Sequence, residues 1–370
     1  MVEALARTPM YEEHRALGAK LVPFAGYEMP VQYGAGILEE HRAVRTAAGL
    51  FDVSHMGEVE ITGPAALDLV QRVTTNDAST VEVGQAQYSV MCDEDGGAID
   101  DCIVYRLPDR WMIVVNASNR HKDVAWITKA ARDFDARVDD RSDDIALLAL
   151  QGPRAQEILG SLTGTDLDLI RYYHFEEGKV AGAPAIISRT GYTGEDGFEL
   201  YVDAAEGARL WRAVLDAGRV MGILPIGLGA RDSLRLEMGY ALYGNDIDET
   251  HNPLEAGLGW VVKLDKGDFF GRDALARVKQ EGVRQRLVGF VLEDRGFPRH
   301  GYVLRHDGEA VGEVTSGILS PTLQQGIGLG YVATEASKAG TAVEVVIRDR
   351  GIGASVVRPP FYRAGSVRRT

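Results

Sequence analysis

The order of apolar and polar positions along the chain predicts helices that alternate with short strands. Apolar residues recur at helical spacing in residues 9–18, 37–48, 119–134, 205–219, 229–238 and 272–280. Runs rich in Val, Ile, Leu and aromatic residues lie between them, as at residues 111–116, 185–189 and 198–202. Thr8 and Pro9 are expected to begin the first helix, and Gly18 to end it.

Beyond residue 260 the pattern changes. Apart from the helix at 272–280, short strand-like runs recur at residues 286–292, 301–305, 310–315, 326–332, 342–347 and 353–357. Strands that follow one another every 8–12 residues or so are typical of a small antiparallel barrel or sandwich. We therefore expect a domain boundary near residues 245–260.

Two segments share a pattern of strand, Gly-Pro and helix. They are VEITGPAALDLV (59–70) and LALQGPRAQEIL (148–159). Proline suits the first turn of a helix, so each Gly-Pro pair predicts a sharp strand-to-helix corner. The segments indicate two related units, although the motif is short enough to arise by coincidence.

Residues 88–105 (YSVMCDEDGGAIDDCIVY) predict a β-hairpin. Asp95-Gly96 suits a two-residue type I′ turn, which would place Val90 opposite Asp101. Alternation then puts Asp101 on an apolar face beside Tyr88, and Asp100 on the other face, toward water. Desolvation would raise the pKa of Asp101 and suit it to proton transfer. The alternative is a solvated acidic hairpin.

The two cysteines of the chain, Cys92 and Cys102, both lie in this hairpin. The same register places Cys92 opposite Ile99, and Cys102 on the other face opposite Ser89. The thiols should not reach each other, and their spacing does not suit a metal site.

Composition describes an ordinary soluble protein. The 370 residues are 45% hydrophobic and 25% charged, enough for two or three domains. A net charge of −14 argues against binding to nucleic acid, which needs a basic surface. No apolar run is long enough to span a membrane and no signal peptide is visible, so we expect a cytoplasmic protein.

Common cofactor and nucleophile motifs are missing from the sequence. Two GxG runs, at residues 34–36 and 227–229, lack the third glycine of a dinucleotide site. P-loop, GxSxG and HExxH motifs are absent. His55 stands alone between two strand-like runs, where a structural role is favoured over a ligand role.

Two further stretches combine glycine with polar residues. RTGYTGEDGFEL (189–200) reads either as a series of tight turns or as a loop that approaches a flat ligand. In the second case Tyr192 would stack on the ligand and Glu199 would accept a pair of N–H bonds. Arg231 begins a helix, where acidic residues are preferred, so it either pairs with a nearby acid or serves a ligand.

Eight blocks spread along the chain resemble the T-protein, or aminomethyltransferase, family of the glycine cleavage system. They are FAGYEMPVQY (24–33), FDVSHMGE (51–58), YSVMCDEDGGAIDD (88–101), RTGYTGEDGFEL (189–200), GLGARDSLRLE (227–237), NPLEAGLGWVVKL (252–264), GEVTSGILSPTL (312–323) and PPFYRAGSVRR (359–369). The related dimethylglycine and sarcosine oxidases carry an added flavin domain, for which this chain has no room.

The resemblance implies an α+β fold of three domains around a central folate cavity. Antiparallel sheets would carry helices, and a β-barrel or jelly-roll-like domain would end the chain. The expected bounds are residues 1–50 and 142–245 for a discontinuous first domain, 51–141 for an inserted second domain, and 246–370 for the barrel domain.

The resemblance also implies an activity. The family transfers the methylene carbon of the aminomethyl group on lipoylated H-protein to tetrahydrofolate. The products are 5,10-methylenetetrahydrofolate, ammonia and dihydrolipoyl H-protein. Tetrahydrofolate is a co-substrate, and no metal, PLP or flavin is expected; nor is a nucleic-acid or membrane partner.

Matching positions give the implied site. Asp101 corresponds to the family's key acid. The implied folate contacts are Tyr88, Asn116, Tyr192, Glu199 and Arg231, with Met56 and Trp260 as weaker matches on the cavity wall. In the C-terminal tail, Arg358, Arg363, Arg368 and Arg369 form either a frayed, solvated end or a docking patch for an acidic partner.

Two alternatives remain open at this point. One is another folate-dependent one-carbon transferase on the same scaffold, for instance acting on a free methylamine. The other is a folate-binding protein without transferase activity. Ammonia release from an aminomethylated lipoyl carrier, with and without tetrahydrofolate, would separate all three.

Overall fold

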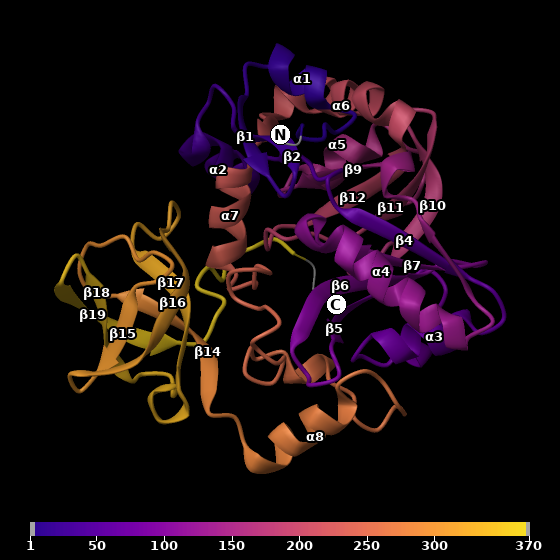
Figure 1. Ribbon diagram of the computed structural model, residues 1–370. Helices are drawn as coiled ribbons and strands as arrows, with labels where there is room; N and C mark the ends of the chain where they lie inside the picture. Colours follow the sequence, from indigo (N-terminus) through magenta and orange to yellow (C-terminus); the bar gives the residue numbers. More distant parts are fainter. Residues whose placement is uncertain (1–3, 368–370) are drawn as a thin grey trace.

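The computed structural model describes residues 4–367 as an α+β protein with two large sheets and a closed barrel (Figure 1). The expected fold class is confirmed. Among these residues no helix has the length and apolar character needed to cross a bilayer.

The first unit is a six-stranded sheet in which β13 runs parallel to β3 and the other neighbours are antiparallel. In spatial order its strands are β10 (Phe175–Val180), β11 (Ala183–Ser188), β12 (Gly197–Asp203), β9 (Ile145–Gln151), β3 (Gly49–Asp52) and β13 (Leu224–Ile226). Its helices are α1 (Tyr11–Ala16), α2 (Ile37–Thr46), α5 (Ala155–Gly160), α6 (Ala204–Gly218) and α7 (Leu228–Glu237), and β1 (Lys20–Phe24) with β2 (Tyr27–Gln32) forms a separate hairpin.

The second unit is a five-stranded antiparallel sheet with helices over one face. Its spatial order is β5 (Ala86–Cys92), β6 (Ala98–Arg106), β7 (Trp111–Val115), β4 (Gly57–Thr62) and β8 (Arg137–Asp140). Helices α3 (Ala66–Val73) and α4 (Arg120–Ala130) bury Leu69 and Ile127 against this sheet.

The chain between the paired strands β3 and β9 forms this second sheet. Phe51 and Asp52, expected in the inserted unit, therefore complete a strand of the first sheet. The division into three domains at the bounds given above stays a prediction.

Helix α8 (Arg272–Glu281) leads into a closed barrel. The barrel confirms the succession of short strands expected in this part of the chain. Around the barrel the strands are β14 (Gln285–Leu292), β17 (Gly326–Ala333), β16 (Glu309–Leu319), β15 (Val303–His306), β18 (Ala342–Ile347) and β19 (Arg350–Val357). Phe290, Leu304 and Val345 fill its interior.

Short 3₁₀ turns connect these elements. They are η1 (Ala78–Thr80), η2 (Ala117–Asn119), η3 (Ala131–Asp133), η4 (Ser142–Asp144), η5 (Arg219–Met221), η6 (Gly259–Val261) and η7 (Thr334–Ala336).

Both Gly-Pro corners are confirmed, at the β4–α3 and β9–α5 junctions. Gly63 and Gly152 have φ of 108° and 134°, and a Cβ at either would lie within 3 Å of backbone atoms. Glycine is therefore required at both turns. The expected cap of the first helix is wrong: the Thr8 hydroxyl donates instead to the buried Asp52 carboxylate (2.6 Å).

Candidate functional site

A cavity of about 840 Å³ lies at the centre of the molecule, with walls from both large sheets, α7 and the barrel. All eight residues selected from the sequence line it: Met56, Tyr88, Asp101, Asn116, Tyr192, Glu199, Arg231 and Trp260. Most of its surface is apolar with a few converging polar groups, as is usual for small-molecule sites. Residues 4–367 contain no group of three or more His, Cys, Asp or Glu placed to hold a metal ion.

The β5–β6 hairpin orients Asp101. Val90 lies opposite Asp101 and Ser89 opposite Cys102, so the expected register is confirmed at these positions. The expected two-residue turn is wrong. Asp93 N donates to Gly97 O (3.0 Å), and the loop between them has three residues, of which Gly96 has positive φ (89°).

A side chain explains this turn. The Asp93 carboxylate accepts bonds from Asp95 N and Gly97 N (both 2.9 Å), which favours an ordinary turn with glycine at its end. A β-bulge beside Cys92 then places it opposite Ala98, not Ile99, and restores the register before Val90. Both cysteines are buried free thiols.

The Asp101 carboxyl group reaches the cavity from a largely buried position. Tyr88 Oη donates to Oδ2 (2.9 Å) and Asn116 Nδ2 donates to Oδ1 (2.8 Å). Burial, followed by the charge of Asp100, raises the pKa of Asp101 to about 7, although both hydrogen bonds act to lower it. Asp101 can therefore gain or lose a proton near neutral pH.

Asp100 was expected to face water, and this is wrong: its side chain is fully buried. Its carboxylate accepts bonds from Asn116 N (2.9 Å), Asn116 Nδ2 (2.9 Å) and Asn119 Nδ2 (2.7 Å). Strand alternation assigned the face correctly. It could not show that η2 and α4 cover that face.

Glu199 and Arg231 bring opposite charges to the cavity. Glu199 accepts a bond from Thr190 Oγ1 (2.5 Å), and burial raises the pKa of Glu199 despite this bond and the charge of Arg231. Within residues 4–367 no ion pair joins Arg231 to an acid, so the salt-bridge alternative is not found. Its guanidinium instead lies 4.9 Å from the centre of the Tyr192 ring, in cation–π geometry.

Two stacked aromatic pairs give the cavity flat surfaces. Tyr192 stacks with Tyr240 (5.6 Å between ring centres, 22° between planes), and its hydroxyl donates to Ala241 O. Tyr88 stacks with Trp260 (5.9 Å, 20°), which is 60% exposed. Such walls suit a planar ligand.

The 189–200 loop combines both interpretations given above. A Cβ at Gly191 would lie 1.9 Å from Gln151 Oε1, and one at Gly194 (φ 79°) would lie 2.2 Å from Met238 Sδ. Close packing therefore requires these glycines, and the resulting turn directs Tyr192 to the cavity.

His55 does not line the cavity, and the structural role favoured for it stays a prediction. It is buried with its ring edge-on to Phe24 and Tyr27, and burial lowers its pKa to about 4. Tyr172, Tyr173 and Tyr240 line the cavity but were missed. The adjacent tyrosines were a visible signal, whereas the positive φ of Tyr173 (60°) has no sequence signature.

Comparison with known proteins decides the family. Residues 10–266 match the GCVT N-terminal domain, and residues 285–363 match the glycine cleavage T-protein C-terminal barrel domain. The chain belongs to the glycine cleavage T-protein family. The resemblance inferred from the eight sequence blocks is thereby confirmed.

Relatives of this T-protein family member are similar over nearly their full length. A protein named aminomethyltransferase from Symbiobacterium thermophilum is 56% identical, over 98% of this chain and 99% of its own. One from Moorella thermoacetica is 53% identical, over 97% and 98%. The crystal structure of glycine cleavage system aminomethyltransferase T from Bartonella henselae matches with a TM-score of 0.91 at 36% identity, covering 98% of this chain and 99% of that one.

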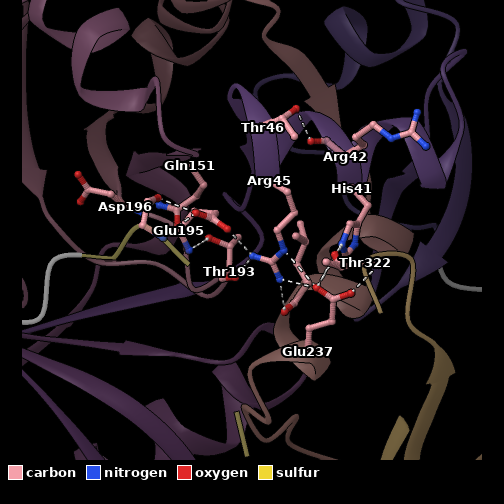
Figure 2. A network of polar contacts seen from close by, with 12 residues as sticks. His41, Arg42, Arg45, Thr46, Gln151, Thr193, Glu195, Asp196, Glu237 and Thr322 are labelled. Atoms are coloured by element: carbon pink, nitrogen blue, oxygen red, sulfur yellow. Dashed lines mark hydrogen bonds and ion pairs between the residues drawn. The ribbon is translucent and has the colours of Figure 1, made fainter. Parts of the chain in front are cut away.

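A buried network of charged side chains holds the 189–200 loop of this family member (Figure 2). Arg45, from α2, donates to Thr193 O (2.7 Å), Glu195 Oε1 (2.9 Å) and Glu237 Oε2 (2.8 Å). Thr322, before β17, donates to the same Glu237 oxygen (3.0 Å). Two helices, the loop and the barrel thus share one set of contacts.

The C-terminal tail joins this network. Ser366 N and Oγ donate to Glu195 Oε2 (2.8 and 2.6 Å), and the Arg45 guanidinium lies 4.1 Å from the centre of the Tyr362 ring. A frayed tail is therefore wrong as far as residue 366. Arg358 and Arg363 are exposed, whereas Arg368 and Arg369 lie outside the described residues.

Proposed function

We propose that the protein is the aminomethyltransferase of a glycine cleavage system. It transfers the methylene carbon of the aminomethyl group on lipoylated H-protein to tetrahydrofolate. The observation that carries the proposal is Asp101, a carboxyl with a pKa of about 7 on the wall of a cavity suited to a planar ligand. Family membership supports the same assignment.

The folate pterin is proposed to lie against the Tyr192 side of the cavity. Glu199 can accept two parallel bonds from the amino and ring N–H groups of the pterin. Arg231, which is fixed over Tyr192, adds a positive charge and further donors. Further contacts with folate are proposed for Asn116, Tyr88, Met56 and Trp260.

The chemistry needs positioning and proton transfer, with no protein nucleophile. Two folate nitrogens bond to the carbon, while its bonds to ammonia and to the lipoyl sulfur break. Of the two N–H protons that folate loses, one leaves with the amine and one goes to the sulfur. Asp101 stabilises the positive charge that develops on the carbon and passes protons between these groups.

Asp101→Asn tests the central assignment. The amide cannot carry a negative charge or exchange a proton, so kcat should fall by roughly 100-fold or more. Tetrahydrofolate should still bind, as measured by calorimetry, because the pterin contacts remain. A variant that turns over at the wild-type rate would exclude Asp101 as the catalytic carboxyl.

The assay itself separates the alternatives. Ammonia is measured from aminomethylated lipoyl carrier, with and without tetrahydrofolate, and from free methylamine donors. Folate-stimulated release that requires the carrier supports the proposal. Carrier-independent release would indicate another one-carbon transferase, and folate binding without release would indicate a binding protein.

We propose that the carrier docks through basic residues of the tail. H-proteins are usually acidic, and the chain as a whole carries a charge of −14, so a local basic surface is needed. The exposed Arg358 and Arg363 provide part of it.

A further inference from the structure

A third carboxyl group lies behind Asp101, beneath the five-stranded sheet. Asp123, from α4, is fully buried, and neither of its oxygens has an N–H or O–H donor among residues 4–367. Its neighbour Asp100 is equally buried but accepts three N–H bonds, from Asn116 and Asn119. The two carboxyl groups contact each other through a side-chain hydrogen bond, and all the amide donors lie on Asp100.

The unequal distribution of these donors indicates which of the two carboxyl groups carries a proton. Two adjacent buried carboxylates cannot both be ionised at low cost, and the negative charge is favoured where the donors are. A buried oxygen of Asp123 can take part in a hydrogen bond only if it carries a proton and donates it to Asp100. Consistent with this, burial and then the charge of Asp100 raise the pKa of Asp123 to about 11, and a hydrogen bond joins the pair.

Asn116 connects this pair to the cavity. Its Nδ2 donates to Asp100 Oδ1 (2.9 Å) and also to Asp101 Oδ1 (2.8 Å). The charge on Asp100 is also the second cause of the raised pKa of Asp101, after burial. A change in the charge or position of Asp100 should therefore alter the pKa and the hydrogen bonding of the proposed catalytic carboxyl, Asp101.

We propose that Asp123 is a positioning residue that holds a proton against Asp100, and so fixes the Asn116 amide and the charge behind Asp101. The inference rests on the proposed catalytic role of Asp101. Asp123 itself does not line the cavity, so it acts on the reaction only through Asp100 and Asn116.

Other titratable groups face the three carboxyls and enter the pH dependence. They are Tyr88 from β5, Cys102 from β6, Lys122 from α4, and Tyr192 and Tyr243 from segments next to the cavity. Lys122 donates to Ile99 O (2.9 Å) and to Glu249 (2.9 Å), so its charge is already paired.

Infrared difference spectroscopy tests the proton directly, without substrate. At pH 8.5, above the pKa of Asp101, the wild-type minus Asp123→Asn spectrum in ²H₂O should contain the C=O band of a protonated carboxyl. Asp133→Asn, an exposed acid in the turn after α4, is the matched control and should remove no such band. Absence of the band from this difference spectrum would overturn the proposal, whatever the activity of the protein.

The pH dependence of kcat/KM tests the coupling. In Asp123→Asn an amide N–H replaces the donated proton, so the acidic limb should stay at the wild-type pH. In Asp123→Leu the donor is lost, but the three amide N–H bonds keep Asp100 ionised. Its charge, no longer shared with the Asp123 proton, acts more strongly on Asp101, and the limb should move to higher pH. In Asp100→Asn the charge is removed, and the limb should move to lower pH by about one unit.

A purely structural role would not move the acidic limb in opposite directions in Asp123→Leu and Asp100→Asn. Nor would it leave the limb of Asp123→Asn at the wild-type pH. Equal profiles for Asp123→Asn and Asp123→Leu would overturn the proposal. If Asp100→Asn fails to fold, the infrared band and the two Asp123 variants still decide it. If instead no variant or wild type releases ammonia while the band is present, the proposed function fails and the buried proton stands.

Discussion

At the scale of single residues, Glu58 shows how burial without a hydrogen-bond partner raises the pKa of a carboxyl group. Glu58, on β4, is fully buried, and neither carboxyl oxygen has a partner among the described residues. Burial raises the pKa of Glu58 well above its ordinary value, although the charge of Arg120 opposes the shift. We therefore expect the side chain to be neutral in the folded protein at neutral pH.

A neutral buried Glu58 predicts that Glu58→Gln increases the free energy of unfolding by an amount that depends on pH. Since the pKa is higher in the folded than in the unfolded chain, the stabilisation is complete below the unfolded value and is lost as pH rises toward the folded one. The wild-type free energy of unfolding should lose up to about 1.4 kcal/mol per pH unit from this group. Glu58→Gln removes the loss, so urea denaturation should show it more stable than wild type at pH 8, with a smaller difference at pH 5.

Glu82 is exposed, so Glu82→Gln is the control. Its effect on the free energy of unfolding should be small at both pH values. A Glu58→Gln effect that does not change between pH 5 and pH 8 would contradict a neutral buried Glu58.

Among single residues, the sequence predicted which face each side chain occupies but not what covers that face. Alternation placed Asp101 beside Tyr88, as observed. The same rule could not show that Asn119 and Asp123, more than fifteen positions along the chain, enclose Asp100. Such contacts depend on how α4 packs, which local periodicity does not contain.

At the scale of elements, α2 binds the 189–200 loop to α7 through Arg45. The side chain of Arg45 is 5% exposed, and those of its partners Glu195 and Glu237 are 2% and 0% exposed. Removing the cation would leave two carboxylates buried without their main partner, and this is far more costly than the loss of a surface pair.

Arg45→Met should therefore lower the free energy of unfolding by about 3–5 kcal/mol. Arg42→Met, three residues earlier on α2, is the control, because Arg42 is exposed and pairs with Glu39 on the surface. Its cost should be about 0.5 kcal/mol or less. Urea denaturation of both variants measures the contrast. Similar losses in the two would show that the network adds little.

Elements were predicted where their signals are local. The spacing of strands gave the barrel, and both Gly-Pro pairs gave corners. The hairpin turn was missed because the Asp93 side chain, rather than the Asp-Gly pair, selects its geometry. Thr8 was misread because its hydroxyl has a buried partner on β3, in Asp52, which outweighs a helix cap.

At the scale of the whole molecule, the cavity is shared by units that are far apart in sequence. Val288 and Leu329 of the barrel line it together with Tyr88 of the five-stranded sheet and Glu199 of the six-stranded sheet. No sequence pattern marked the barrel residues, because an apolar strand position looks the same whether it faces a core or a cavity. A ligand in this cavity should therefore stabilise all three units together.

Hydrogen exchange with 5-formyltetrahydrofolate, a stable folate, tests this expectation. At a free concentration of about 100 times Kd, binding should add about 2.7 kcal/mol to the stability of the folded state. The amides of β6, β12 and β14 should all gain protection, because their strands carry Asp101, Glu199 and Val288 on the cavity wall. Strand β18, on the barrel but without a residue in the wall, is the internal reference for any global effect. Protection confined to β6 and β12 would mean that the barrel does not contribute to the folate site.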